Sequence, residues 1–454
     1  MNIIIIGDGK VGYTIAEHLA KENHNITVID NNEDALKKAD DTLDVMCVKG
    51  NGARKSVLLE AGIESADILI AATSRDEINM ICCLMAKKIC DVRTVARIRD
   101  PEYYEEFSDL QQNLGIDVVI NPEYAAAIEV ANILQFPSAM NIEPFFGGRV
   151  RMVEFRVQKG DMLDGVKLSQ LGNGKWPANT LVLAVERQQE VYIPGGDFTF
   201  QEGDSIFVMG QIQSLTELFR AMNRYVPQVH SVMIAGGGRT AYYLAKIIGR
   251  LNISVKIIEI STKKCNKLSE DIPNAMIIEG DATSKDVLEA ENIEDVDAFI
   301  TMTGRDEENL ITAMYAVERG VDKVIAMTTR VNLPSIINKL GLDSVVSPKL
   351  VTASHIIGYV RGMQNSKGSI VESLYKIVDG KAEIISFVAS ESTKIIDIPL
   401  RELRLKKEVL VACIQHGSHI IVPHGNEQIK KGDKVLVVTK DNTRILSLDD
   451  IVAD

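Results

Sequence analysis

The sequence predicts an α/β protein with two Rossmann-like, doubly wound parallel sheets, each followed by a small β-rich α+β domain. Three observations lead to this prediction. The chain of 454 residues repeats itself in two halves, each half begins with alternating strand and helix patterns, and each half ends in short β-branched runs. At roughly 100–200 residues per domain, this length suggests three or four domains.

The repeat consists of matched blocks that return in the same order. Gly7 matches Gly236 and Asp30 matches Glu259, both at an offset of 229 residues. The other matches are GNGA (50–53) with GDAT (280–283), AATSRDEIN (71–79) with TMTGRDEEN (301–309), and VVINPE (118–123) with VVSPK (345–349). Matches in one order at a nearly constant offset indicate a tandem duplication.

Strands are predicted in the first repeat at residues 2–6, 26–30, 45–48, 68–72 and 94–98. The helix predicted over residues 11–21 has Val11, Ile15 and Leu19 four positions apart, and a polar helix follows the second strand. A later helix is expected to lay one apolar face on the sheet, made of Ile78, Ile81, Cys82, Met85, Ala86 and Ile89. Such alternation is typical of parallel sheets covered by helices.

The end of each repeat has a different pattern. Residues 150–210 and 371–440 hold short β-branched runs interrupted by Gly, Pro and Asn, and each contains a similar turn, EGDSIFV (202–208) or KGDKVLV (431–437). These patterns predict a small β-rich domain after each Rossmann-like domain. The predicted domains are 1–140 and 226–368 for the Rossmann-like pair, and 141–225 and 369–454 for the β-rich pair.

Composition restricts the classes of partner. Apolar residues make up 46% of the chain and charged residues 25%, as in ordinary globular proteins. The net charge of −13, without a dense Lys or Arg cluster, argues against binding to nucleic acid or anionic lipid. No segment approaches the ~20 apolar residues of a membrane span, and the apolar run at the N-terminus is too short for a signal peptide. We expect a soluble, cytoplasmic protein without direct membrane insertion.

Reactive side chains are few. Six scattered cysteines fit a reducing compartment, and Cys82 and Cys83 are interpreted as core residues rather than a redox pair. His416, His419 and His424 are close in sequence, but the Gly and Pro residues among them indicate turns that separate the rings, so no metal site is predicted. The sequence contains no GxSxG, HExxH or Walker A motif and no paired CxxC. No catalytic residues are predicted.

The first Gly-rich turn, Gly7-Asp8-Gly9-Lys10-Val11-Gly12, stands between a predicted strand and a predicted helix. In a dinucleotide fold such glycines permit a tight turn, close approach of a pyrophosphate and packing of helix on strand, while helix N–H groups face the phosphates. Asp30 ends the next strand, where a carboxylate accepts hydrogen bonds from ribose and favours NAD or an adenine nucleotide over NADP. The alternative is a glycine turn beside a solvated aspartate.

The second Gly-rich turn is Gly236-Gly237-Gly238-Arg239-Thr240-Ala241, and Glu259 takes the place of Asp30. Alanine at the third glycine position still permits close packing of the helix on the strand. A second nucleotide site is therefore predicted here. The alternative is a copy that is purely architectural.

Arg97 and Arg99 are predicted to close the fifth strand, at the carboxyl edge where ligands bind in such sheets. A guanidinium at this edge is suited to holding a phosphate. The alternative for Arg97 is an ion pair with a neighbouring carboxylate. Met-Thr-Thr-Arg (327–330) takes this place in the second repeat, so the two sites are expected to prefer different ligands.

These blocks, together with VARIRDPEYY (95–104) and IDVVINPE (116–123), resemble the regulator-of-potassium-conductance (RCK) domain. The tandem arrangement, over essentially the whole chain, resembles the Trk-type peripheral potassium uptake subunits of bacteria. The resemblance implies that both nucleotide sites extend into the matched loops, which adds Asn51, Thr73, Ser74, Asp281 and Thr303. Asn51 departs from the family, which often has Asp there, whereas Asp281 retains it.

The resemblance also implies a cytosolic, nucleotide-sensing regulatory subunit rather than an enzyme. Such subunits bind NAD(H) or ATP/ADP and assemble as homo-oligomers, expected here to be tetramers, into a gating ring under a membrane potassium channel or transporter. The partner would hold the chain at the inner face of the cell membrane. One alternative is an NAD-dependent dehydrogenase, which needs a proton-transfer residue that the sequence does not offer. A structural scaffold is the other, and two retained glycine turns argue against it.

Overall fold

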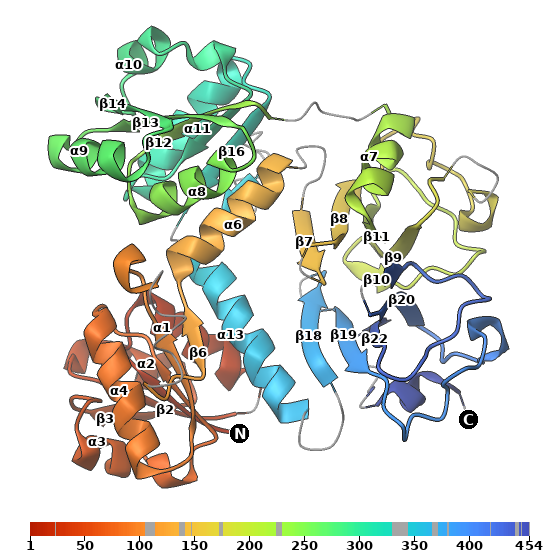
Figure 1. Ribbon diagram of the computed structural model, residues 1–454, viewed down its shortest axis with the longest axis horizontal. Coiled ribbons are helices and arrows are strands. Elements are labelled where there is room, and N and C mark those ends of the chain that lie inside the picture. Colours follow the sequence, from red (N-terminus) through yellow and green to blue (C-terminus); the bar gives the residue numbers. More distant parts are fainter. Residues whose placement is uncertain are drawn as a thin grey trace. The chain divides into compact units, whose positions relative to one another are not determined.

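The computed structural model describes residues 1–22, 24–104, 114–135, 141–146, 148–171, 176–223, 229–328, 344–365, 371–378, 381–417, 419–440, 445 and 447–453. They belong to two compact units, Met1–Gln135 with Val229–Ile357, and Phe136–Gln228 with Gly358–Asp454. The first unit holds two parallel sheets and the second holds two antiparallel sheets (Figure 1). The domain boundaries expected near residues 140, 225 and 368 lie outside the described residues and stay predictions.

The first parallel sheet has the strand order β3-β2-β1-β4-β5-β6. Its strands are β1 (Asn2–Ile6), β2 (Asn25–Asp30), β3 (Met46–Lys49), β4 (Ile68–Ala71), β5 (Arg93–Arg97) and β6 (Val118–Ile120). The helices between them are α1 (Lys10–Ala20), α2 (Glu33–Thr42), α3 (Lys55–Glu60) and α4 (Asp76–Ile89). The order reverses between β1 and β4, which places the ligand crevice of this topology at their carboxyl ends.

The second parallel sheet repeats this order as β14-β13-β12-β15-β16-β17. Its strands are β12 (Ser231–Ala235), β13 (Ser254–Glu259), β14 (Ala275–Glu279), β15 (Ala298–Thr301), β16 (Lys323–Met327) and β17 (Ser344–Val346). The helices are α8 (Arg239–Gly249), α9 (Thr262–Asp271), α10 (Lys285–Ala290) and α11 (Asp306–Glu318). Two sheets with one strand order confirm the predicted pair of doubly wound folds.

Two details of the first repeat differ from the sequence prediction. Ile81 was expected on the buried face of α4, but it is 44% exposed, and Asn79 is fully buried instead. The buried face is rotated because the Asn79 amide bonds backbone groups at the carboxyl ends of the strands, whereas Cys82 and Cys83 lie in the core as predicted. β5 ends at Arg97, so Arg99 lies beyond the strand rather than at its end.

The antiparallel sheets belong to the β-rich domains. The first has the order β10-β9-β11-β8-β7, with β7 (Asn141–Phe145), β8 (Val150–Arg156), β9 (Thr180–Arg187), β10 (Glu190–Tyr192) and β11 (Ser205–Gly210), and it is followed by α7 (Ile212–Ala221). The second has the order β18-β19-β22-β20-β21, with β18 (Val371–Ile377), β19 (Ala382–Val388), β20 (Val409–His416), β21 (His419–Ile421) and β22 (Lys434–Lys440). These sheets complete the predicted fold class.

The repeated Gly-Asp turn gives each β-rich domain a buried carboxylate. Asp204 accepts hydrogen bonds from Arg187 Nε and Nη2 at 2.7 Å, and Asp433 lies 2.6 Å from His416 Nδ1. The His416 ring therefore contacts the turn of its own domain, while His416 pairs with His419 in the β20–β21 ladder. Within the described ranges, no three His, Cys, Asp or Glu side chains are grouped as metal ligands.

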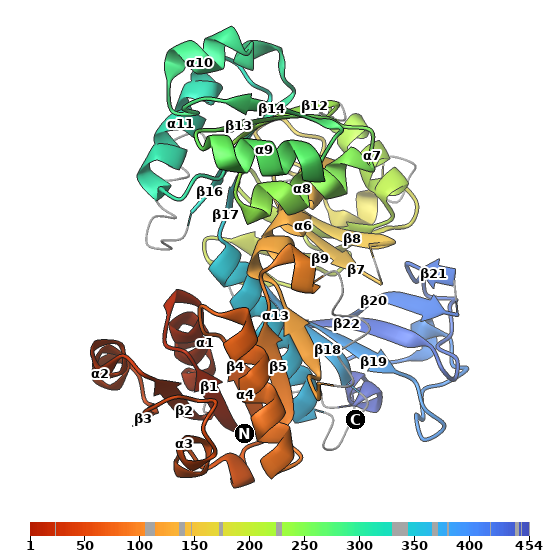
Figure 2. The ribbon, with the colours of Figure 1, turned by 60° about the vertical axis from the view of Figure 1, so that its left-hand side comes forward.

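Helix α6 (Pro122–Gln135) follows β6 of the first repeat but packs against α8 of the second (Figures 1 and 2). Its side chains Val130 and Leu134 are fully buried and share one hydrophobic cluster with Leu244 and Ile257 of the second Rossmann-like domain. The alanines of its sequence, PEYAAAIEVANILQ, let the two helix backbones approach closely. One element of the first repeat therefore completes the core of the second.

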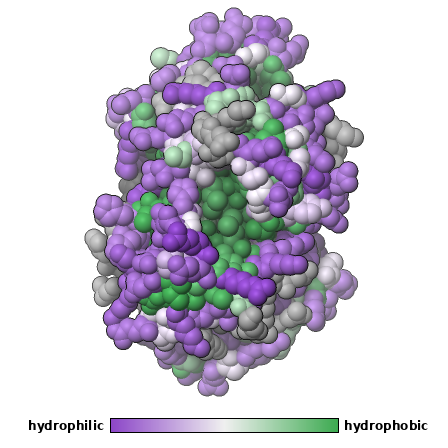
Figure 3. Space-filling model, turned by 90° about the vertical axis from the view of Figure 1, so that its right-hand side faces the viewer, coloured by the Kyte–Doolittle hydropathy of each residue, from purple (hydrophilic) through white to green (hydrophobic). Residues whose placement is uncertain are grey.

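The helices of the described residues include none that is both long and apolar enough to cross a membrane. Hydrophilic residues cover most of the face shown in Figure 3, around a hydrophobic region near its centre. Buried apolar side chains of the helices described above pack against the parallel sheets.

Truncation of α6 tests this packing. We expect Leu134→Ala, at a fully buried position, to lower the free energy of unfolding by about 2–5 kcal/mol because it leaves a cavity between the repeats. Ile128→Ala on the same helix, at a residue 37% exposed, is the control and is expected to cost about 0.5 kcal/mol or less. Urea unfolding measures both variants, and equal losses would contradict the shared core.

Candidate functional site

The first Gly-rich turn joins β1 to α1 at the reversal of strand order. Gly7 has φ +98, and a Cβ there would lie 2.8 Å from the Thr73 backbone, so only glycine fits. A Cβ on Gly12 would lie 1.8 Å from Gly7 O, which explains the close packing of the helix on the turn. Gly9 has ordinary backbone angles and open space where its Cβ would be. Gly9 therefore leaves room above the N-terminus of α1, whereas Gly7 and Gly12 shape the turn.

Asp30 closes this crevice at the end of β2. Its Oδ2 accepts the N–H of Asp8 at 2.6 Å and its Oδ1 accepts the N–H of Asn32 at 2.8 Å. The carboxylate is thus fixed beside the Gly-rich turn rather than free in solvent. Asp30 is therefore not the solvated aspartate of the alternative, because both of its oxygens accept backbone N–H groups.

Asp8 adds a second carboxyl group to the first crevice. It is 8% exposed, and its Oδ1 is buried without a hydrogen-bond partner. Burial, reinforced by the negative charge of Asp30 and opposed by Lys38, raises the pKa of Asp8 to about 6. The second repeat has Gly237 here, because a Cβ would lie 2.6 Å from Leu268 Cδ1.

Asn79 ties together the strand ends that line the first crevice. Its Oδ1 accepts the Thr73 N–H at 2.9 Å, and its Nδ2 donates to Arg97 O at 2.8 Å. Arg97 Nη1 in turn donates to Thr73 O at 3.3 Å, while its Nε is buried without a partner. Burial and the nearby charge of Arg99 lower the pKa of Arg97. Arg97 thus lies at the crevice with donor capacity unused.

The alternative of an ion pair applies to Arg99 and not to Arg97. Arg99 Nε donates to Glu123 Oε1 at 2.7 Å, and this carboxylate raises the pKa of Arg99 against the effect of burial. No ion pair joins Arg97 to another residue in the described part of the chain. Of the two arginines, Arg97 alone is therefore available to an anion.

The second crevice repeats the geometry of the first. Gly236 has φ +105, and a Cβ there would lie 3.0 Å from Met302 O. Glu259, 5% exposed, accepts the N–H of Gly237 at 2.8 Å through Oε2 and the N–H of Ser261 at 3.0 Å through Oε1. Lys264 Nζ lies 3.4 Å from Glu259 Oε2. The longer carboxylate thus binds the same backbone positions as Asp30 does.

Asn309 is the counterpart of Asn79. It accepts the Thr303 N–H at 2.9 Å and donates to Met327 O at 2.9 Å. Met327 therefore takes the position of Arg97, and the second crevice lacks that guanidinium. Thr329 and Arg330 lie outside the described residues.

The remaining predicted site residues surround the same two turns. Lys10 and Arg239 are the first residues of α1 and α8, followed by the buried Val11 and Thr240. Asn51 Oδ1 accepts the N–H of Ala53, and Asp281 Oδ1 accepts the N–H of Thr283, a bond that lowers the pKa of Asp281. Ser74 is exposed after β4, and Gly238 has open space like Gly9.

Sequence patterns did not reveal three buried residues that bond the backbone around the crevices, namely Asn79, Asn309 and Asp76, nor the buried Asp306, which matches Asp76 in the second repeat. Asp76 Oδ2 accepts the N–H groups of Arg99 and Asp100, both at 2.8 Å. A signal was present, because both blocks that end in Asn79 and Asn309 retain the same Asp and Asn. Hydrophobic periodicity alone does not select these polar residues as buried, although both amides are buried and bonded to backbone.

Both halves of the chain match family models in tandem. The TrkA-N domain matches residues 3–122 and 232–348, and the TrkA-C domain matches residues 152–223 and 384–447. The chain belongs to the TrkA family. The Trk system potassium uptake protein TrkA homolog 2 of Methanosarcina mazei is 35% identical over 96% of this chain and 97% of its own length. The TrkA protein of Halomonas elongata is 31% identical over 98% and 97%.

Solved structures share the fold at lower identity. The GsuK channel bound to NAD has a TM-score of 0.64 and 17% identity, over 97% of this chain and 76% of that one. GsuK bound to ADP has a TM-score of 0.50 and 16% identity, over 80% and 69%. The isolated GsuK RCK domain has a TM-score of 0.63 at 17% identity, which confirms the resemblance to RCK domains at the level of fold.

Buried Asp8 predicts a pH dependence of stability. Its pKa is about 6 in the folded chain and close to 3.8 when unfolded, so the folded state binds more protons between these values and loses stability as pH rises through them. We expect Asp8→Asn to be more stable than the parent by ~1–3 kcal/mol at pH 7.5, with the difference shrinking towards pH 4. Asp91→Asn, at an exposed side chain, is the control. A difference that does not change with pH, measured by urea unfolding, would contradict the assignment.

Proposed function

We propose that the protein is a nucleotide-sensing regulatory subunit that binds NAD(H) or ATP/ADP in both Rossmann crevices and controls a membrane potassium-transport protein. The observation that supports this most is the pair of Gly-rich turns at helix N-termini, each facing a fixed carboxylate. Helix N–H groups at Gly9 and Gly238 would receive the phosphates, and Asp30 and Glu259 would receive the ribose hydroxyls.

Residues around the two Gly-rich turns would complete each nucleotide site. The guanidinium of Arg97, whose Nη1 bonds Thr73 O, would bind phosphate in the first crevice only. Thr73 and Thr303, fixed by the two buried asparagines, would line the far side of each phosphate group. Solved structures of GsuK, a distant structural neighbour, include NAD-bound and ADP-bound forms, which supports both ligand classes. The named site residues, including Asn51, Ser74 and Asp281, remain our assignment.

Ring assembly and the pore partner belong to the proposal as well. Relatives that share the full length of the chain are named as Trk system potassium uptake proteins, which supports a membrane potassium-transport partner and a cytoplasmic position beneath it. Ile311, Met314 and Val317 follow one side of α11 and are 68%, 40% and 36% exposed. We assign this apolar stripe to contacts between copies in a ring of four.

The mechanism requires only modest discrimination at each site. A ligand shifts a two-state ring by its difference in affinity for the two states. Reversal of a population from 1:99 to 99:1 takes ~5.5 kcal/mol, so eight crevices in a ring of four would each need less than about 1 kcal/mol. Binding without chemistry is sufficient, and we propose no enzymatic activity.

Matched substitutions in the two turns test nucleotide binding. Gly9→Val and Gly238→Val each place a side chain in open space, so both variants are expected to fold while the side chain blocks the phosphates. Calorimetry with NADH and ATP should show one class of site lost in each variant and no binding in the double variant. Binding by the double variant equal to that of the parent would refute the proposal. Oxidation of NADH by any metabolite would favour the dehydrogenase alternative.

The two crevices should also respond differently to loss of Arg97. In the Gly238→Val background, Arg97→Ala is expected to weaken ATP about tenfold or more and AMP less, because charge-assisted hydrogen bonds contribute ~1.5–3 kcal/mol. In the Gly9→Val background the same substitution should change affinity by less than about twofold, because Arg97 reaches the second crevice only through its charge interaction with Arg239. Identical rankings of AMP, ADP, ATP and NAD in both backgrounds would contradict the predicted difference between crevices.

A further inference from the structure

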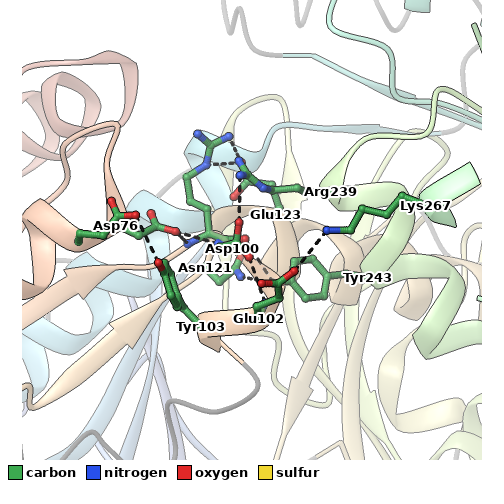
Figure 4. A network of polar contacts seen from close by, with 11 residues as sticks. Asp76, Asp100, Glu102, Tyr103, Asn121, Glu123, Arg239, Tyr243 and Lys267 are labelled. Carbon is green, nitrogen blue, oxygen red and sulfur yellow. Dashed lines mark hydrogen bonds and ion pairs between the residues drawn. The ribbon is translucent and has the colours of Figure 1, made fainter. Parts of the chain in front are cut away.

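A segment of the first repeat lies at the mouth of the second crevice. It begins after β5 with Arg99 and Asp100, whose N–H groups bond Asp76, and continues into a helical turn from Pro101. Figure 4 shows its acidic side chains directed at cations of the second repeat. Asp100 Oδ2 lies 3.4 Å from Arg239 Nη2, and Glu102 Oε1 lies 3.4 Å from Lys267 Nζ.

Buried contacts, not these ion pairs, hold the segment in place. Tyr243 of α8 is 3% exposed, and its hydroxyl accepts from Asn121 Nδ2 at 2.9 Å and donates to Arg99 O at 3.3 Å. The rings of Tyr104 and Tyr124 lie 6.2 and 5.3 Å from the Tyr243 ring. The Glu102–Lys267 pair is solvent-exposed, with side chains at 79% and 66%, and the Asp100–Arg239 pair is partly exposed, at 35% and 44%. They can therefore be neutralised without separating the domains.

The cations concerned flank the crevice. Arg239 is the first residue of α8, beside the Gly-rich turn, and Lys267 lies one turn after Lys264, which reaches Glu259. Both would attract the phosphates of a nucleotide. Because each is paired with a carboxylate of the first repeat, an incoming phosphate competes with that carboxylate and is repelled by it. The repulsion grows with the number of phosphate charges.

The first crevice has two matching cations, but no carboxylate of the described residues forms an ion pair with them. Lys10 and Lys38 match Arg239 and Lys267 at the offset of 229 residues. Neither forms an ion pair with a described residue, and Lys38 instead lies over the Tyr13 ring. Lys349, at the start of α13 (Pro348–Asn365), has its pKa lowered by burial and then by the charge of Lys10, which indicates a third cation nearby.

We propose that Asp100 and Glu102 of the first repeat lower the affinity of the second crevice in proportion to phosphate charge, so that it selects NAD(H) over ATP. The inference rests on the proposed binding of nucleotides in this crevice. It makes the second crevice the dinucleotide site. Specificity in one repeat thus depends on residues of the other.

The test uses the full-length chain with Gly9→Val, so that only the second crevice binds. Asp100→Asn keeps the side-chain oxygen that accepts the Glu102 N–H, and Glu102→Gln changes an exposed group, so the combined variant is expected to fold. Calorimetry without magnesium should give ATP affinity raised about three- to tenfold and NADH affinity raised less than about twofold. The gain for ATP should largely disappear near 1 M salt.

Asp91→Asn is the control for a charge change away from the crevice, since it removes one negative charge, half of the change in the combined variant, at an exposed residue just before the opposite end of β5. Equal changes for ATP and NADH, or no change in either, would overturn the inference while nucleotide binding itself stands. A Gly9→Val chain that binds neither ligand would overturn both the inference and the proposed function of the second crevice. If the Gly238→Val chain still bound nucleotide, the proposed function would fail only for the second crevice and not for the first.

Discussion

Burial of α6 in the core of the second repeat is the constraint on which the rest of the structure depends. The helix follows β6 of the first sheet, yet Val130 and Leu134 are fully buried beside residues of the second domain. The first domain cannot move away without exposing this apolar surface to water, which costs roughly 25 cal/mol per Å². The same contact brings Asn121 and Arg99 to Tyr243, and burial raises the pKa of Tyr243, so its hydroxyl stays a donor.

Rigid crevices result from buried polar groups rather than from the glycines alone. Asn79 and Asn309 each bond two strand ends, and Asp76 bonds the backbone that leads into the acidic segment. An unpaired buried amide or carboxylate costs several kilocalories, so these residues have one arrangement in the folded chain. A ligand in either crevice would therefore bind to a fixed frame.

The fold was predictable because its signals are local. Alternating strands and helices, two Gly-rich turns and a constant repeat offset are sufficient to predict two doubly wound sheets, and the predicted strand ends of the first repeat differ from the observed ends by one residue or less. The predicted buried face of α4 was wrong at Ile81, because hydrophobicity does not reveal that the buried Asn79 amide forms hydrogen bonds with the backbone.

The site residues near the Gly-rich turns could be predicted from the sequence for the same reason, because strand–turn–helix geometry is set by neighbours in sequence. The ion pairs of Asp100 and Glu102 with the second repeat could not be predicted. They depend on the packing of α6 against α8, and no pattern within one repeat indicates that packing. The unused donor of Arg97 and the raised pKa of Asp8 likewise follow from burial, which a sequence motif does not give.

Location of the ligands is the most direct test of this account. We would crystallise the chain with an adenine nucleotide that carries bromine on the base and record anomalous scattering. We expect a bromine beside Asp30 or Glu259, with phosphate density over Gly9 or Gly238 at the N-terminus of the adjacent helix. Ordered nucleotide bound elsewhere on the chain, with both Gly-rich turns free of phosphate, would contradict it.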